Sequence, residues 1–211
     1  MTISPFQVRQ CSNPDCHFRF PVTDSRAPGE SCPVCKMPTD LAATYADGFK
    51  PEPLPASAEP VIEVLLDNIR SIYNVGSILR TADGAGLTHL HCCGITAPLH
   101  HPKIVKTALG AEKSVGWTKS RNGLETAVSL KQRGYQLLAL ECTPDAIMLL
   151  DFQLNNTQPI VLVVGNEVAG VDPGILAICD QTIMLPMQGV KNSLNVASAF
   201  AVAAYALRFG F

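Results

Sequence analysis

The sequence lacks the features of a membrane or secreted protein. No apolar run approaches the roughly 18 residues of a membrane-spanning helix. The first ten residues, MTISPFQVRQ, lack the charged and then apolar layout of a signal peptide. We therefore expect no membrane partner and a cytoplasmic location.

Strong net charge and the common nucleotide-binding motifs are also missing. The formal net charge is −2 at pH 7, so no global basic field indicates a nucleic-acid partner. No GxGxxG follows a predicted strand, and no GxxxxGK(S/T) occurs, which argues against dinucleotide-binding and P-loop enzymes. The chain also shows no internal repeat.

What is present indicates a globular protein in two parts. The 211 residues are 47% hydrophobic, enough for one good core and a small satellite module. The segment GFKPEPLPASAEP, residues 48–60, contains four prolines and predicts an extended linker. It separates a small part, residues 1–47, from a larger part, residues 61–211.

The larger part alternates strand-like and helix-like segments. Strands are predicted at 61–66, 87–93, 135–141, 160–164 and 181–186, and helices at 74–86, 124–133, 173–179 and from about 193 to 209. Such alternation predicts an α/β domain with a mostly parallel sheet and helices on both faces. The alanines of the last helix make it slim and apolar nearly all round, so we expect it to pack on more than one side.

The small part carries two cysteine pairs on tight, turn-forming segments. Four residues separate Cys11 from Cys16 and two separate Cys32 from Cys35, a spacing that suits a closed four-thiolate zinc site with a structural role. Disulfides and a rubredoxin-like iron site are the alternatives, and His17 is a possible substitute ligand. We interpret the other cysteines as reduced core residues: Cys92, Cys93, Cys142 and Cys179.

Three polar segments interrupt the apolar pattern of the larger part. In the first, Asn74 is placed to cap the helix that follows, and Arg80 leans back toward the start of that helix. In the second, Glu167 lies in a glycine-bounded turn directly after a strand. In the third, Ser193 or Asn195 can cap the last helix. Because ligands bind beyond the carboxyl ends of strands in open α/β sheets, we expect the three segments to meet there.

The first two segments also have explanations that involve no function. The first could be a helix cap with an exposed arginine, and the second a turn with a solvated glutamate. Capping does not explain the whole third segment, in which Gln188, Lys191, Asn192, Ser193 and Asn195 are polar.

A local excess of basic residues lies between positions 103 and 121. Five basic residues face one acid there: Lys103, Lys106, Lys113, Lys119 and Arg121 against Glu112. Such a run only suggests a nucleic-acid contact, because a run of charges is more often a solvated face. The histidines at 89, 91, 100 and 101 precede the segment, and a second metal site among them is a weaker alternative to ordinary strand and loop histidines.

At this point the residues resemble a known family. NVGSILRTADGAG (74–86), VVGNEVAG (163–170) and LPMQGVKNSLNVASAFAVAAYAL (185–207) look, in order and spacing, like the three motifs of the SpoU (TrmH-type) RNA 2′-O-ribose methyltransferases of the SPOUT superfamily. The segment HPKIVKTALGAEKSV (101–115) is similar to that family's substrate-side segment. The resemblance covers residues 61–211. Ala197 departs from the serine that is common in the family after SLNV, and Ser198 follows it.

The resemblance implies an α/β fold with a C-terminal deep trefoil knot and a homodimer through the C-terminal helix. It implies S-adenosylmethionine-dependent methyl transfer to a ribose 2′-hydroxyl of rRNA or tRNA. The residues that match the family's catalytic positions are Asn74, Arg80, Glu167, Ser193 and Asn195. Those that match cofactor-binding positions or lie beside them are Leu140, Gly165, Leu185, Met187 and Leu194. The basic segment would then meet the RNA backbone.

Two other functions stay open at this stage. One is a non-catalytic RNA-binding or assembly protein that keeps the fold. The other is the same chemistry on a base nitrogen or another acceptor. For the methyltransferase we expect Arg80 to stabilise charge rather than act as a base, because a guanidinium stays protonated.

Overall fold

The computed structural model describes residues 6–23, 29–44, 52, 54, 60–154 and 158–210. The chain divides into two compact units, residues 1–55 and 56–211, each of which is described by itself. Most of the expected linker, residues 48–60, lies outside the described residues. Within the described ranges, no helix is both long and apolar enough to cross a membrane.

The N-terminal unit is a small antiparallel sheet that the sequence pattern did not predict. It consists of β1 (Gln7–Cys11), β2 (Arg19–Val22) and β3 (Thr39–Thr44), in the order β2-β1-β3. Little apolar side-chain surface is buried here; Val8, Cys11 and Cys32 are its buried hydrophobic residues among those described. The two cysteine pairs lie on turns that adjoin the strands.

The larger unit is built on a seven-stranded sheet, and the expected α/β class is confirmed. Its strands are β4 (Ile62–Asp67), β5 (His89–Cys93), β6 (Gly116–Ser120), β7 (Gln136–Leu140), β8 (Ile147–Met148), β9 (Ile160–Val164) and β10 (Gln181–Met184). Their order is β6-β5-β4-β9-β7-β10-β8, and the pairings between them are parallel. The carboxyl ends of the strands therefore share one edge.

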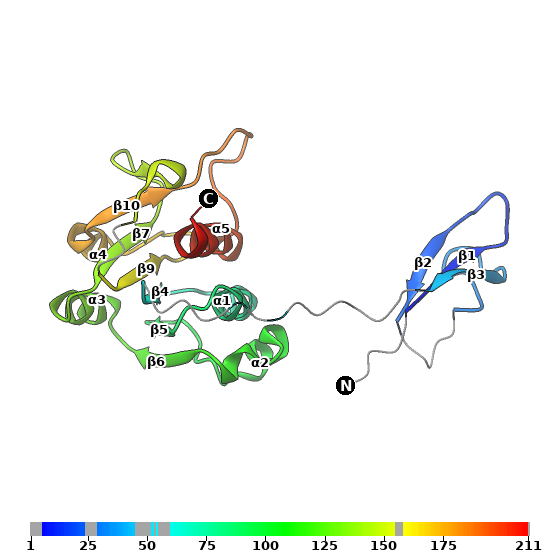
Figure 1. Ribbon diagram of the computed structural model, residues 1–211, viewed down its shortest axis with the longest axis horizontal. Coiled ribbons are helices and arrows are strands. Elements are labelled where there is room, and N and C mark those ends of the chain that lie inside the picture. The colour runs from blue at the N-terminus through cyan, green and yellow to red at the C-terminus, as the bar shows by residue number, and fades with distance from the viewer. Residues whose placement is uncertain are drawn as a thin grey trace. The chain divides into compact units, whose positions relative to one another are not determined.

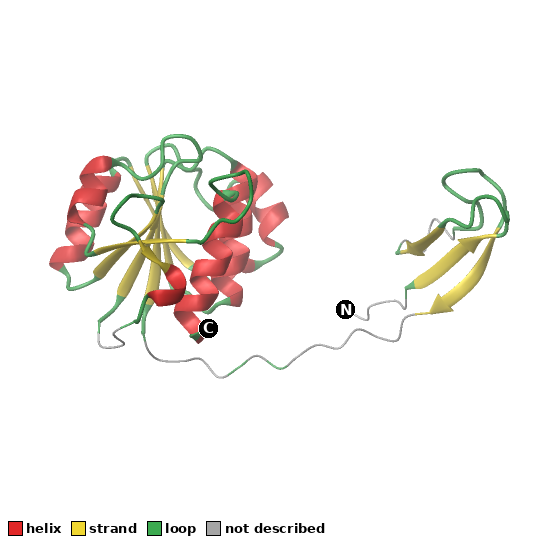
Figure 2. Ribbon diagram, turned by 90° about the horizontal axis from the view of Figure 1, so that it is seen from above, coloured by secondary structure: helices red, strands yellow, loops and turns green. Residues whose placement is uncertain are grey.

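Helices cover both faces of this sheet (Figures 1 and 2). On one face lie α1 (Ile72–Gly84), α2 (Pro102–Ala108) and α5 (Val196–Phe209); on the other lie α3 (Gly123–Gln132) and α4 (Pro173–Ile178). Two short 3-10 helices, η1 (Ala111–Lys113) and η2 (Leu149–Asp151), complete the described helical elements.

The strand residues divide between two hydrophobic cores. Ile62, Val64 and Leu66 of β4 point to the core beneath α1 and α5, whereas Leu65 points to the core beneath α3 and α4. All six residues of β4 are buried, as expected for a strand covered on both faces. Because β4 is covered on both faces, its sequence does not alternate between apolar and polar residues as that of a half-exposed strand does.

Helix α5 packs against α1, β7 and β9 through one side. Its buried residues are Ala197, Phe200, Ala203, Ala204 and Leu207, and the alanines allow close approach. Near its end, the guanidinium of Arg208 donates three hydrogen bonds to backbone carbonyls of Pro60, Ala85 and Gly86, at 2.9–3.0 Å. The other side of α5 leaves Val202, Tyr205 and Phe209 exposed.

The predicted cap of α5 is present, but the predicted cap of α1 is wrong. Asn195 caps α5 and accepts from the backbone N–H groups of Ala197 and Ser198. Helix α1 starts at Ile72, and its cap is Ser71, whose Oγ accepts from Asn74 N at 3.3 Å. Asn74 therefore lies inside the first turn, and its side chain is available for a contact across the sheet edge.

Candidate active site

The three polar segments of the larger unit meet at the carboxyl edge of the sheet. The first follows β4 and leads into α1, the second follows β9, and the third joins β10 to α5. Since β4 and β9 are neighbours and β10 lies beyond β7, their following turns come together although they are far apart in sequence. Hydrogen bonds between their side chains and backbones connect all three.

Glu167 is the centre of the contact between the first two segments. Its Oε2 accepts from Arg70 N, and its Oε1 accepts from Ser71 N and from Asn74 Nδ2, each at 2.9 Å. Burial by itself would raise the pKa of Glu167, but these hydrogen bonds stabilise the carboxylate and lower its pKa below the usual range. The negative charge is therefore fixed next to the start of α1.

Asn74 and Asn195 extend this contact to the third segment. Asn195 Nδ2 donates to Asn74 Oδ1 at 3.2 Å, while Asn195 Oδ1 is occupied by the first N–H groups of α5. Each amide thus uses its donor and its acceptor for different partners. The chain Glu167–Asn74–Asn195 couples the turn after β9 with the starts of α1 and α5.

The turn after β9 needs its glycines. Asn166 and Gly170 exchange two backbone hydrogen bonds of 2.9 Å, which fold residues 165–170 into a tight loop. A Cβ at Gly165 would lie 2.2 Å from the carbonyl carbon of Gly170, and Gly170 has φ +76°. Side chains at these positions would open the loop that presents Glu167.

A cavity of about 470 Å³ opens between these segments. It is lined by Leu140, Glu141, Cys142, Val164, Gly165, Asn166, Glu167, Val168, Gly170, Met184, Leu185, Met187, Asn192, Ser193, Leu194, Asn195, Val196 and Ala199. All five predicted cofactor-binding residues are in this lining, and so are three predicted catalytic residues: Glu167, Ser193 and Asn195. The volume and the mixture of apolar walls with a few polar groups are typical of a small-molecule site.

The structure does not bring Arg80 into this group. Arg80 is exposed on α1 and is absent from the cavity lining, and its guanidinium forms no hydrogen bond or ion pair within the described part of the chain. Six helical positions turn the chain by about 240° and advance it by about 9 Å, so Arg80 and Asn74 leave different sides of α1. The expected convergence of these two side chains is not present as a direct contact.

Sequence reasoning missed two acidic residues that shape this edge. Glu141 directly follows β7 and lines the cavity. Asp67 ends β4 and accepts from Asp172 N at 2.9 Å and from Asn68 Nδ2 at 2.7 Å; burial raises its pKa in spite of these donors. Asp67 follows the predicted strand 61–66, and Glu141 ends the predicted strand 135–141. These positions are the only indication in the sequence that the two acids lie at this edge of the sheet.

Cys142 also differs from the expectation. We interpreted it as a core cysteine, but it is exposed and lines the cavity, because it lies in the turn after β7. Cys92 and Cys93 on β5 are buried free thiols as expected, and Cys179 is half-buried.

The basic side chains of residues 103–121 are exposed. Lys103 and Lys106 lie on α2, Lys113 on η1, and Lys119 at the end of β6, and all are exposed together with Arg121. The neighbouring His91 is instead buried, with Nε2 2.7 Å from Glu63 Oε2 and Nδ1 3.0 Å from Thr118 Oγ1. Across the described ranges, no group of side chains able to hold a metal ion contains His89, His91, His100 or His101.

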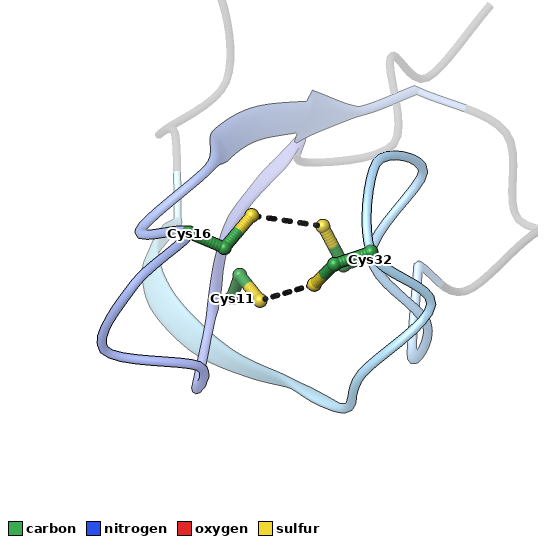
Figure 3. A group of neighbouring side chains, drawn as sticks. Cys11, Cys16 and Cys32 are labelled. Carbon is green, nitrogen blue, oxygen red and sulfur yellow. Dashed lines mark hydrogen bonds between the residues drawn. The ribbon is translucent and has the colours of Figure 1, made fainter.

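The four N-terminal cysteines do form such a group (Figure 3). Their Sγ atoms all lie within 4.8 Å of one another, with 3.3 Å from Cys11 to Cys35 and 3.9 Å from Cys16 to Cys32. All four are free thiols. A tetrahedral zinc with bonds of about 2.3 Å separates its sulfur ligands by about 3.8 Å, so the cluster has the size of a four-thiolate zinc site.

The two cysteine turns share one geometry. His17 and Lys36, each placed directly after the second cysteine of its pair, have positive φ values of 47° and 64°. His17 N donates to Asn13 O at 3.1 Å, and Lys36 N donates to Cys32 O at 3.0 Å. The backbone amide of Met37 and the thiol of Cys11 lower the pKa of Cys35 to about 7, whereas burial raises the pKa of Cys11 to about 12. The thiolate is therefore favoured at Cys35 and the thiol at Cys11.

Fold and site together define a class: a parallel α/β domain with a small-molecule cavity at the carboxyl edge of its strands. Comparison with known proteins gives the family. The sequence profile described as "SpoU rRNA Methylase family" matches residues 61–205, and the chain belongs to this family.

Characterised relatives are enzymes that methylate RNA. The chain is 33% identical over 145 residues to the tRNA (guanosine(18)-2′-O)-methyltransferase of Aquifex aeolicus, a match that covers 67% of this chain and 66% of that protein. It is 30% identical over 187 residues to the 23S rRNA (guanosine(2553)-2′-O)-methyltransferase RlmP of Bacillus subtilis, covering 89% and 68%. The chain thus spans slightly less than two thirds of the Aquifex relative.

Solved structures agree with this assignment. The SpoU methyltransferase AviRb from Streptomyces viridochromogenes, in complex with the cofactor AdoMet, superposes with a TM-score of 0.64 at 30% identity and covers 72% of this chain and 60% of that one. The AdoMet-bound rRNA methyltransferase from Sinorhizobium meliloti superposes with a TM-score of 0.66 at 25% identity, covering 71% and 56%.

Proposed function

We propose that this protein is an S-adenosylmethionine-dependent RNA methyltransferase that acts on a ribose 2′-hydroxyl of rRNA or tRNA. The observation that carries the proposal is the chain of hydrogen bonds Glu167–Asn74–Asn195, which joins the three family motifs at the rim of the cavity. The relatives and the AdoMet-bound neighbours support the reaction class.

The cavity fits the cofactor. Leu140, Leu185, Met187 and Leu194 offer apolar walls for the adenine ring, while Gly165 exposes backbone for close approach. When bound, S-adenosylmethionine supplies an electrophilic methyl group on a positively charged sulfur. The task of the protein is then to hold a ribose hydroxyl in line with that methyl group and to favour loss of the hydroxyl proton.

The catalytic group divides this task. Glu167 holds Asn74 and the start of α1 in place, and Asn195 does the same for the start of α5. Ser193 lines the cavity, and its proposed role is to contact the acceptor ribose. Arg80 stabilises negative charge on the oxygen or on a neighbouring phosphate, which requires it to approach the site when RNA binds, or to serve the site of a second subunit.

The N-terminal unit is proposed to be a zinc-ribbon-like module of residues 1–47, joined by residues 48–60 to the methyltransferase domain of residues 61–211. Cys11, Cys16, Cys32 and Cys35 would hold a structural zinc, which explains how so small a unit folds. We also propose a C-terminal deep trefoil knot, which the resemblance of the three motifs implies, and a cytoplasmic location.

A homodimer through α5 accounts for the exposed apolar residues of that helix. Val202, Tyr205 and Phe209 are 38–46% exposed, and Tyr205 and Phe209 are ring neighbours at 5.4 Å. Sedimentation of wild-type protein and of a Val202→Asp variant tests this arrangement, with monomer expected only for the variant.

Calorimetric titration with S-adenosylmethionine is the first test of the proposed activity. We expect one site per chain in the folded protein and methyl incorporation into rRNA or tRNA, located by mapping 2′-O-methyl sites in cells with and without the gene. Folded protein that does not bind the cofactor would refute the enzymatic proposal.

The separation of Arg80 from the cavity favours one alternative, a non-catalytic RNA-binding protein that retains the fold. Arg80→Ala separates the two functions. An enzyme loses methyl transfer, whereas a pure binding protein keeps its RNA affinity and its effect in cells.

A further inference from the structure

One acidic residue of the cavity has no part in the proposed catalytic group. Glu141 follows β7 directly, and its backbone N–H donates to Ile183 O of the neighbouring β10 at 3.1 Å. Its carboxylate accepts from Cys142 N and from Val171 N, both at 3.0 Å. Among the described residues, two backbone N–H donors thus hold this carboxylate in place, and Glu141 lines the cavity.

The space for this carboxylate depends on Gly170. A Cβ at that position would lie 2.5 Å from Glu141 Oε2, and the positive φ of Gly170 turns the backbone so that the next N–H, that of Val171, points at the carboxylate. The loop after β9 is thus shaped around Glu141 on one side and carries Glu167 on the other.

The lining of the cavity is unbalanced in charge. Glu141 and Glu167 are its acidic members, and none of the described residues that line it is Lys, Arg or His. Glu167 directs both oxygens toward the start of α1. A positively charged ligand in this cavity therefore meets two carboxylates and no cationic side chain.

S-adenosylmethionine and its demethylated product, S-adenosylhomocysteine, differ by one unit of charge. The first carries a sulfonium, the second a neutral thioether, and both share the adenosine and the amino-acid part. We propose that Glu141 is a specificity-determining residue that favours the cationic methyl donor over the neutral product. The inference rests on the proposed function and assigns a role to this side chain within the same site.

The role has a consequence for turnover. Loss of the methyl group removes the positive charge on sulfur, so the attraction between Glu141 and the sulfonium ends when the product forms. The neutral product is then held by its adenosine and amino-acid contacts alone, which promotes exchange for a new methyl donor. A charge interaction of the strength that two unit charges have in a water-filled cavity changes the ratio of the two affinities by about fourfold.

The test is calorimetric titration of wild-type protein and Glu141→Gln with S-adenosylmethionine, S-adenosylhomocysteine and sinefungin. Sinefungin carries a protonated amine in place of the sulfonium methyl group. We expect Glu141→Gln to lower the preference for the methyl donor over the product by about fourfold, and sinefungin to follow the methyl donor. Glu125→Gln, which removes an exposed carboxylate of α3 outside the cavity lining, is the matched control and should leave the ratio unchanged.

The outcomes separate this inference from the proposed function. Wild-type protein that binds neither ligand refutes the proposed function itself. Equal weakening of all three ligands in Glu141→Gln would make Glu141 a support of the loop and overturn the inference. If the variant does not fold, salt titration of wild-type protein decides: the preference for the methyl donor must fall between 50 mM and 500 mM NaCl because screening weakens the charge interaction, and a constant ratio refutes the role.

Discussion

Replacing Arg208 by alanine should destabilise the larger unit strongly. Arg208 is half-buried near the end of α5, and its guanidinium donates to three backbone carbonyls: Pro60 O at 2.9 Å, Ala85 O at 3.0 Å and Gly86 O at 3.0 Å. These carbonyls belong to the chain before β4 and to the end of α1. One side chain thus ties the last helix to two other segments.

The expected loss follows from those three bonds. A hydrogen bond from a charged donor contributes about 1.5–3 kcal/mol, and partial access of water reduces this to about 1 kcal/mol for each bond here. Arg208→Ala should therefore lower the free energy of unfolding by about 3 kcal/mol. At about 3 °C for each kcal/mol in a domain of this size, the melting temperature falls by about 9 °C.

Thermal and urea unfolding followed by circular dichroism measure this effect. Arg208→Lys keeps the positive charge but replaces the planar fork by a single ammonium group, so it should recover no more than about a third of the loss. Arg121→Ala removes an exposed arginine and is the control, with a change below about 0.5 kcal/mol. An Arg208→Ala protein within that same range of wild type would refute the reasoning.

The other predictions concern the site and the cysteine cluster. Glu167→Gln places an amide donor against a backbone N–H group, which removes about 1 kcal/mol of hydrogen bonding. Calorimetry should then show a cofactor affinity about fivefold lower than that of wild type. An unchanged affinity would contradict the role of Glu167. The pKa of Glu167 in the folded protein lies below its ordinary value, so its contribution to stability is present above the pKa of the unfolded chain and is lost as the pH falls through the pKa of the folded protein. The melting temperatures of wild type and Glu167→Gln should therefore converge as the pH is lowered from the unfolded pKa through the folded pKa. A constant difference between them would exclude the linkage. Metal analysis should find one zinc per chain, Cys32→Ser should lower it, and chelation should unfold the N-terminal unit without changing cofactor affinity; a zinc content equal in both proteins would count against the four-thiolate site.

The parts of the fold with strong periodicity were predictable from sequence. The apolar run 160–164 is β9 without a shift, and the predicted helix 124–133 differs from α3 by one residue at each end. By contrast, α2 and β6 were missed. The first has only seven residues and starts at a proline, and the second is an edge strand whose residues are exposed or half-buried, so neither shows a clear apolar pattern.

The site was predictable to the level of segments. Glycines, amides and an acid after apolar strands indicated the sheet edge at which the cavity lies, and all five residues that the family resemblance assigns to the cofactor line it. Which side chains touch was not encoded locally. Both Ser71 and Asn74 were possible caps of α1, and Ser71 is the cap because its Oγ accepts from the backbone N–H of Asn74. The contact of Glu141 with Val171 depends on how the loop after β9 folds, which the local sequence does not show.

The hydrogen bonds of the site also bear on how the protein folds. Glu167 is 93–97 residues from its partners before and in α1, and Asn195 is 121 residues from Asn74. Contacts of such sequence separation pay the full entropy of loop closure and form late. The pairing of β4 with β9 spans a similar separation, as between Ile62 and Ile160. The hydrogen bonds of the proposed active site therefore form only together with, or after, the central strands of the sheet.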